Sequence, residues 1–307
     1  MISVREATGP ETEQWRAEWA RRLRERYVRC YTDPATITRE IERSLGNQRD
    51  DEGGRVYAVE VGGAVAGFLA LGGSRPRRPG QRSLHDLWLA PEHRGRGLGR
   101  AAVAWAREHA AADGGGRLAV VTAPGDPAGD ALFGAYPLRA QQMVKTVPAG
   151  VSLPAGVAGR PMTPVDFALW RDQAIRMYAE EMAASGSRSA ADALAASVAE
   201  HDELLPEGLR TAGHALWCVT AGDEVVATVW LRHGFLPGMS FVLGVDVEPA
   251  HRGRGYGRAA MLVGEQATAA AGDAQLGLNV FGHNTIAMRL YDSLGYQVVE
   301  QYRAEDL

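Results

Sequence analysis

A ten-residue stretch occurs twice in this chain with a single letter changed. Residues 93–102 read HRGRGLGRAA and residues 251–260 read HRGRGYGRAA, so the copies begin 158 positions apart. Upstream of each copy, VYAVEVGGAVAGFLAL (56–71) resembles LWCVTAGDEVVATVWL (216–231) at an offset of 160. A repeat of this length indicates a duplicated domain and excludes a solenoid, whose units are shorter.

The duplication divides the 307 residues into two domains of ordinary size. We predict an N-terminal domain over 1–147, a linker over 148–159 and a C-terminal domain over 160–307. The linker PAGVSLPAGVAG is rich in Pro, Gly and Ala and lacks helical periodicity.

The second copy predicts a mixed α/β domain. A helix capped by Thr163 runs to about Ala184, and a second helix covers about 189–203. Two β-rich runs around Gly222-Asp223 predict a hairpin. Strand, helix, strand, helix and a last strand follow, which gives a mixed sheet with helices.

Composition narrows the function classes. The net charge of −4 argues against a general nucleic-acid binder, and no apolar run is long enough to cross a membrane. The N-terminus has no signal-peptide core, and the two cysteines lack metal-ligand spacing. We therefore expect a cytoplasmic protein without a metal site.

The glycine-rich loop joins a strand to a helix in each copy. Glycine permits positive φ and close backbone approach, and a helix N-terminus offers unpaired N–H groups to an anion. The arginines add positive charge. A tight turn with solvated arginines is the alternative for such a motif in isolation. In the second copy the loop comprises Arg252, Gly253, Arg254, Gly255, Tyr256, Gly257 and Arg258.

Two motifs together resemble a known family. Arg252-x-x-Gly255-x-Gly257 is similar to the acetyl-CoA pyrophosphate loop of the GNAT superfamily of N-acetyltransferases. The segment from Asn284 to Tyr296, NTIAMRLYDSLGY, resembles the second signature of that family. The resemblance implies two tandem GNAT-like domains that use acetyl-CoA, a layout similar to that of mycothiol synthase.

The resemblance also implies how the cofactor is held. The loop from Arg252 to Arg258 would bind the pyrophosphate. The strand over 241–247 would splay from the strand LGLNVF, so that the main chains of Val245 and Val247 reach the pantetheine arm. Asn284 would bind the pantetheine side, a role compatible with that of a helix N-cap. The first copy keeps the equivalent loop residues Arg94, Gly95, Gly97 and Gly99.

Catalysis in this family needs a proton donor and a proton acceptor. The resemblance makes Tyr291 the general acid for the leaving thiolate, and a core tyrosine is the alternative. Asp246 and Glu248 alternate with the valines and so point to the opposite sheet face, which makes them candidate bases in that order. Asn279 replaces a glutamate that some members carry on the next strand, and His283 with a water chain remains open.

The two copies differ outside the loop. At an offset of 158 the first copy lacks the phenol, the strand carboxylate and the amide, so we expect chemistry in the C-terminal domain and a degenerate N-terminal domain. The substituted pairs are Tyr291/Phe133, Asp246/Trp88 and Asn284/Asp126.

The expected reaction is direct attack of a primary amine, of a small molecule or peptide, on acetyl-CoA. Acidic residues on the helices before the hairpin suit a cationic amine, although most such residues form solvated helix faces. The alternatives are a non-catalytic acyl-CoA sensor, or an acyltransferase that uses a hydroxyl acceptor or a longer acyl group. We expect a monomer or homodimer.

Overall fold

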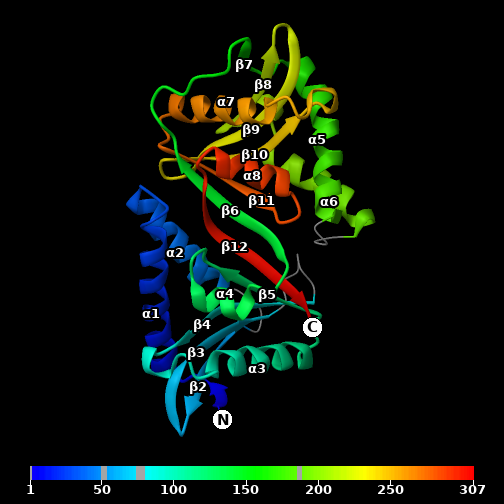
Figure 1. Ribbon diagram of the computed structural model, residues 1–307. Coiled ribbons are helices and arrows are strands. Elements are labelled where there is room, and N and C mark those ends of the chain that lie inside the picture. Colours follow the sequence, from blue (N-terminus) through cyan, green and yellow to red (C-terminus); the bar gives the residue numbers. More distant parts are fainter. Residues whose placement is uncertain (1, 50–53, 74–79, 185–188) are drawn as a thin grey trace. The chain divides into compact units, whose positions relative to one another are not determined.

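The chain forms two compact units in the computed structural model, which describes residues 2–49, 54–73, 80–184 and 189–307 (Figure 1). Unit 1 comprises 1–30, 37–141 and 299–307, and unit 2 comprises 31–36 and 142–298. Each unit is a sheet with helices on both of its faces, as the alternation of strands and helices predicts.

Unit 1 has the sheet order β1-β2-β3-β4-β5-β12. Neighbouring strands are antiparallel except β4 and β5, which are parallel. Its elements are β1 (Ile2–Glu6), α1 (Gly9–Tyr27), α2 (Pro34–Arg49), β2 (Arg55–Val61), β3 (Ala64–Gly72), β4 (Gln81–Leu89), α3 (Leu98–Ala112), β5 (Arg117–Thr122), α4 (Pro127–Phe133) and the end of β12 (Gln297–Asp306).

Unit 2 repeats this order as β7-β8-β9-β10-β11, followed by β6. The predicted capped helices, hairpin and final strand–helix pairs all form within a few residues of their expected bounds. Its elements are the end of β6 (Leu138–Thr146), β7 (Val157–Pro161), α5 (Pro164–Ala184), α6 (Ala190–Leu204), β8 (His214–Ala221), β9 (Glu224–Leu236), β10 (Met239–Val247), α7 (Tyr256–Ala270), β11 (Gln275–Phe281) and α8 (Thr285–Ser293).

Each unit takes its last strand from the other half of the sequence. Residues Gln301 to Asp306 of β12 pair antiparallel with β5 of unit 1. From Gln142 onward, β6 belongs to unit 2, where it neighbours β11. Hydrophobic alternation predicts that a strand exists, but carries no information about its partner.

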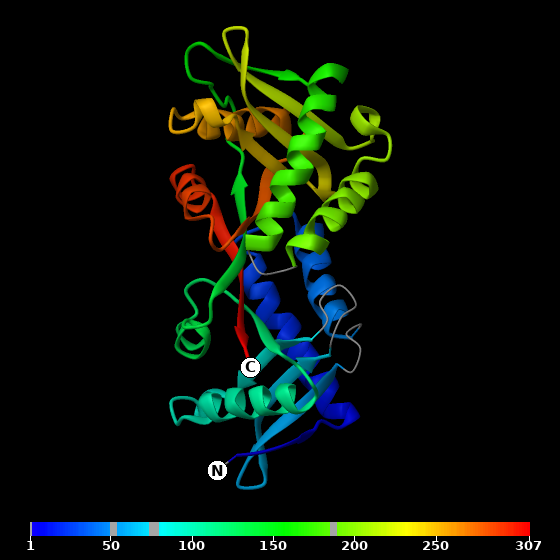
Figure 2. The ribbon, with the colours of Figure 1, turned by 90° about the vertical axis from the view of Figure 1, so that its right-hand side faces the viewer.

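Opposite faces of the unit 2 sheet carry different helices (Figure 2). Val229, Leu231, Leu276 and Leu278 pack with residues of α7 and α8 in one apolar core. On the other face, Trp230 packs against Phe167 and Trp170 of α5, together with Leu243 of β10. Side chains of alternate strand residues therefore reach either the α7/α8 face or the α5 face.

The parallel strands β10 and β11 diverge. Their pairing runs from Met239–Gln275 to Val242–Leu278 and stops there, although β10 continues to Val247. A bulge between Val242 and Gly244 disturbs the β9–β10 pairing at the same level. A bulge bends its strand and redirects the side chains beyond it. The predicted splay of these two strands is therefore confirmed.

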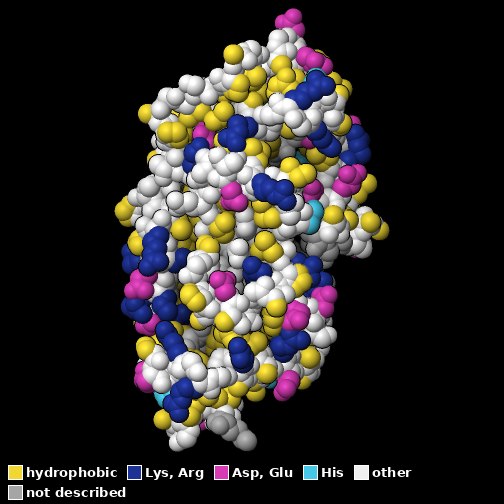
Figure 3. All heavy atoms as spheres, viewed as in Figure 1, with side chains coloured by type: hydrophobic (Ala, Val, Ile, Leu, Met, Phe, Trp, Pro, Cys, Tyr) yellow, Lys and Arg dark blue, Asp and Glu magenta, His cyan; other side chains and the backbone are white. Residues whose placement is uncertain are grey.

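Basic and acidic side chains are intermingled on the face shown in Figure 3. Several arginines of unit 1 pair with nearby carboxylates, such as Arg5 with Glu11 and Glu60 at 2.8 Å. In the described part of the chain, no helix has the length and apolarity needed to cross a membrane.

Candidate functional site

The loop before α7 has the backbone that its glycines predict. Gly253 and Gly255 adopt φ of 75° and 86°, values that L side chains rarely tolerate. Gly255 is the N-cap of α7 and supplies no side-chain acceptor, whereas α6 is capped by the Ser189 hydroxyl and α8 by Asn284. The first N–H groups of α7 are therefore left for an external acceptor, and the helix dipole favours an anion there.

The side chains of this loop are used unequally. Arg252 Nε donates to the Val247 carbonyl at 3.1 Å, so part of this guanidinium holds the end of β10. Arg258 donates to Ser293 Oγ at 2.5 Å, and the Arg254 side chain is exposed. Tyr256 lies edge-on against the His251 ring, with centroids 5.9 Å apart. The predicted pyrophosphate contacts of these residues stay predictions.

Gly257 allows α7 to pack closely on its neighbours. A Cβ at this position would lie 3.2 Å from Leu290 Cδ2 and 3.7 Å from Val247 Cγ2. This glycine therefore serves helix packing, which places the α7 N-terminus directly at the end of β10.

Tyr291, the predicted acid, lies on α8 within the apolar core on the α7/α8 face. Burial raises the pKa of its phenol to about 12. Its ring packs against Tyr296 with centroids 5.9 Å apart. Behind Tyr296, the fully buried Glu265 pairs at 2.7 Å with Lys145, which β6 contributes from the first half of the sequence.

Asp246, the first candidate base, points to the α5 face as its alternation with Val245 and Val247 predicts. Gln173 of α5 donates to its Oδ2 at 2.7 Å, and an Arg252 nitrogen lies 3.8 Å from Oδ1. The two valines pack in the α7/α8 core. Glu248 follows β10 as a half-buried residue, whose N–H donates to the Val226 carbonyl and whose carbonyl accepts from the His251 N–H.

A histidine and a glutamate meet at the open end of β11. Glu181 Oε2 of α5 lies 2.7 Å from His283 Nε2, close enough for an ion pair although the two are not aligned for a hydrogen bond. The His283 ring stacks on Phe281, and Tyr178 of α5 packs on the same Phe281. The sequence shows Glu181 only as one of several acidic helix residues, so this pairing had no local signal.

Asn284 caps α8, because its side-chain oxygen accepts from Ala287 N–H at 3.1 Å. The capping role is thereby confirmed, and the predicted pantetheine contact stays a prediction. In unit 1 the carboxylate of Asp126 performs the same cap for α4, accepting from Ala128 N–H at 3.1 Å.

Unit 1 reproduces the loop without the reactive groups. Gly95 and Gly97 have φ of 71° and 78°, and Arg94 Nε donates to the Leu89 carbonyl at 2.8 Å. The β4–β5 pairing also ends early, at Leu84–Val120. Phe133 is buried where unit 2 has its phenol. Gly99 packs against Leu132, as Gly257 does against Leu290.

Unit 1 nevertheless contains a strand carboxylate that alignment at a constant offset overlooks. Asp86 lies two positions before Trp88 on β4 and is buried. It accepts from Trp15 Nε1 at 2.8 Å and from both terminal nitrogens of Arg22, at 2.9 and 2.7 Å. Asp86 thus anchors α1 on the sheet, where Trp15 and Trp19 of that helix are both buried.

Comparison with known proteins places these features in a family. The model of the acetyltransferase (GNAT) family matches residues 20–134 and 171–296. The chain is 30% identical over 150 residues to the uncharacterized N-acetyltransferase YycN of Bacillus subtilis, covering 48% of this chain and 96% of that protein. It is 33% identical over 224 residues to a mycothiol acetyltransferase of Kineococcus radiotolerans, covering 69% of this chain and 68% of that protein.

A solved structure supports the tandem fold. The GCN5-related N-acetyltransferase from Sphaerobacter thermophilus superposes with a TM-score of 0.58 at 17% identity, covering 99% of this chain and 94% of that one. Each half of the chain thus has a match to the family model, a diverging pair of parallel strands and a glycine-capped helix. The chain is a tandem acyltransferase that belongs to the GNAT family of acetyltransferases.

Proposed function

We propose that unit 2 transfers an acetyl group from acetyl-CoA to a primary amine of a small molecule or peptide, in the cytoplasm. The divergence of β10 and β11 carries the proposal. It opens the sheet between Tyr291 on the α7/α8 face and two groups able to accept protons, Asp246 and His283, on the α5 face.

The residues present fit the acetyl donor. The uncapped N–H groups that follow Gly255 suit its pyrophosphate, and the β10 main chain beyond Val242 has left β11 and can bind an extended arm. The donor supplies an activated thioester. The protein would hold that thioester between two proton-transfer groups.

Tyr291 would donate its proton to the departing sulfur. Burial keeps the phenol protonated at neutral pH, and the same apolar surroundings would destabilise a thiolate beside it. The first effect keeps the proton on the donor but makes the phenol a weaker acid, whereas the second raises the proton affinity of the sulfur and so drives the transfer as the bond breaks.

Asp246 would accept the proton of the attacking amine. Gln173 fixes one carboxylate oxygen and leaves the other with acceptor capacity. His283 is the second candidate, because Glu181 beside it can stabilise the imidazolium that forms. Each of the two candidates lies beside a residue of α5, and these residues, Gln173 and Glu181, are about 12 Å apart along the helix axis.

Thioester consumption by the purified protein tests the proposal. Release of free thiol from acetyl-CoA should depend on an added primary amine and leave an N-acetyl product. Release that requires an alcohol would favour the hydroxyl acceptor. Saturable binding of acetyl-CoA without turnover, across amines of different size and charge, would favour the sensor.

Replacing Asp246 with Asn should lower kcat by about 100-fold, because general-base catalysis typically contributes that much or more. The low-pH limb of the kcat/KM profile should disappear with it. Asp172→Asn, the same substitution at an exposed position of α5, is the matched control and should keep the profile. An unchanged profile in Asp246→Asn, with loss of the limb in Glu248→Gln or His283→Asn, would transfer the role to that residue.

A further inference from the structure

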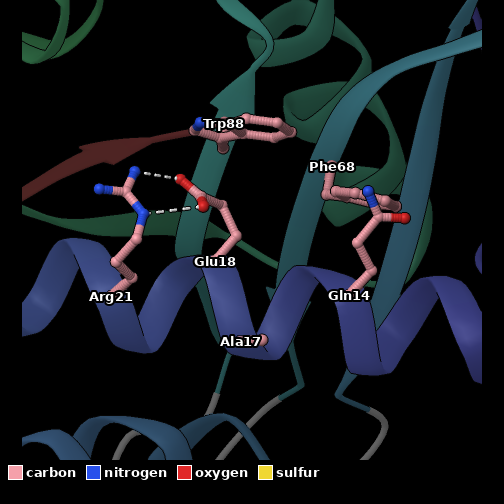
Figure 4. Close-up of a pocket in the computed structure, with 6 residues that line it drawn as sticks. All are labelled: Gln14, Ala17, Glu18, Arg21, Phe68 and Trp88. Atoms are coloured by element: carbon pink, nitrogen blue, oxygen red, sulfur yellow. Dashed lines mark hydrogen bonds and ion pairs between the residues drawn. The ribbon is translucent and has the colours of Figure 1, made fainter.

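A cavity of about 320 Å³ lies on the α1 side of the unit 1 sheet (Figure 4). The rings of Phe68 on β3 and Trp88 on β4 form one wall, nearly parallel at 12° with centroids 6.2 Å apart. In Figure 4 both rings turn a flat face toward α1, which forms the opposite wall. The helix contributes Gln14, Ala17, Glu18 and Arg21.

This cavity occupies the position of the unit 2 base. The register pairs Phe68 with Trp88 in unit 1 and Thr228 with Asp246 in unit 2. Counted from the helix-capping threonines, Glu18 stands where Gln173 stands, each ten residues after its cap. The strand carboxylate and its hydroxyl neighbour have thus been exchanged for an aromatic wall.

The wall facing the rings is held rigidly. The bidentate Arg22–Asp86 contact and the Trp15–Asp86 hydrogen bond fix one side of α1 on β4. Ala17, between the polar residues, leaves the space open. A preformed cavity of this size loses little entropy when a small ligand binds.

The charges at the cavity are already paired. Glu18 accepts from Arg21 at 2.6 and 3.0 Å, and Arg21 also contacts Glu25. The hydrogen bonds from Arg21 lower the pKa of Glu18, so this carboxylate is a poor general base but remains an acceptor. A carboxylate has about four lone-pair sites, of which Arg21 uses two. An ionic ligand would have to compete with these pairs, whereas a neutral donor would not.

We propose that unit 1 binds an uncharged, flat aromatic compound that carries an N–H or O–H donor. The ring of the ligand stacks on the partly exposed Trp88, beside the buried Phe68, and its donor reaches Glu18, with the Gln14 amide available next to it. This is a second ligand site, independent of acetyl transfer in unit 2. We expect no transfer there, because Phe133 stands where unit 2 has the Tyr291 hydroxyl.

Titration of the full-length protein with indole, followed by calorimetry and ligand-observed NMR, tests the site. 1-Methylindole keeps the ring but lacks the donor, and should bind about tenfold more weakly because a hydrogen bond to a charged acceptor is lost. Glu18→Gln should narrow that difference. Trp88→Ala and Ala17→Leu, which remove the wall and fill the cavity, should each weaken indole binding about tenfold or more.

Ala104→Leu, the same substitution at an exposed position of α3, is the control and should bind indole like the natural protein. Melting temperatures verify that the unit 1 variants are folded. The proposal is overturned if indole does not bind saturably, or if Ala17→Leu and Trp88→Ala both bind it unchanged. Tighter binding of tryptamine than of indole would also overturn it, since the ligand would then be a cation.

Discussion

Replacing Tyr291 with Phe is expected to lower kcat by at least about 100-fold while leaving the affinity for acetyl-CoA nearly unchanged. A positioned general acid typically contributes a factor of about 10² to 10⁴. The substitution removes only the hydroxyl, so the ring keeps its packing against Tyr296 in the α7/α8 core. Steady-state rates and acetyl-CoA titration measure the two quantities separately.

The matched control is Phe133→Tyr, which places a hydroxyl at the equivalent position of unit 1. Activity should neither fall in this variant nor recover when it is combined with Tyr291→Phe. If Tyr291→Phe retains full activity, and disruption of the unit 1 loop at Gly97 abolishes it, the chemistry belongs to unit 1.

The pH dependence of the same reaction carries a second signature. Burial raises the pKa of Tyr291 to about 12 from its ordinary value of 10. The phenol therefore stays protonated up to about pH 10 and contributes no falling limb to kcat below that. The shift leaves stability unchanged below pH 10 and costs stability as the pH rises toward 12, because the unfolded chain ionises first.

Truncating the chain after Val298 is expected to destabilise unit 1 and to leave unit 2 stable. The removed residues 299–307 belong to unit 1, where β12 pairs with β5. They include the buried Glu300, which accepts from Tyr27 at 2.5 Å and lies 3.5 Å from an Arg43 nitrogen. Leaving the partners of a buried charged group unpaired costs about 1 to 3 kcal/mol, against a total of about 5 to 15 for a domain.

Hydrogen exchange measures this effect directly. The amides of β5 should lose protection in the truncated chain, and those of β10 and β11 should keep theirs. Glu300→Gln, which keeps the strand, is the matched variant and should retain the β5 protection with a lower melting temperature. Unchanged β5 exchange in the truncated chain would show that β12 does not belong to unit 1.

Most of the fold follows from patterns local in the sequence. The capping threonine before α5, the Gly222-Asp223 turn and the proline that ends β10 each act on a few neighbouring residues. Their elements form at the expected bounds for that reason. The divergence of β10 from β11 followed from the family resemblance, since no local pattern encodes the end of a strand pairing.

The position of a site residue was predictable where the conformation of a single helix or strand determines it. Asp246 reaches the α5 face because side chains alternate along a strand, and Asn284 caps α8 because its amide binds a backbone three residues away. Gln173 beside Asp246 and Glu181 beside His283 were not predictable, since each pair joins residues that are far apart in the chain.

The repeats in the sequence were enough to establish duplication, a glycine-rich loop before a helix in each copy and the unequal positions Tyr291 and Phe133. These are properties of short segments, which backbone conformation and side-chain type decide locally. Tertiary structure alone decided that β6 and β12 change units, that Asp86 anchors α1 and that Trp88 faces a cavity. Such contacts depend on which distant segments bury one another, and the free energy of that choice is spread over the whole core.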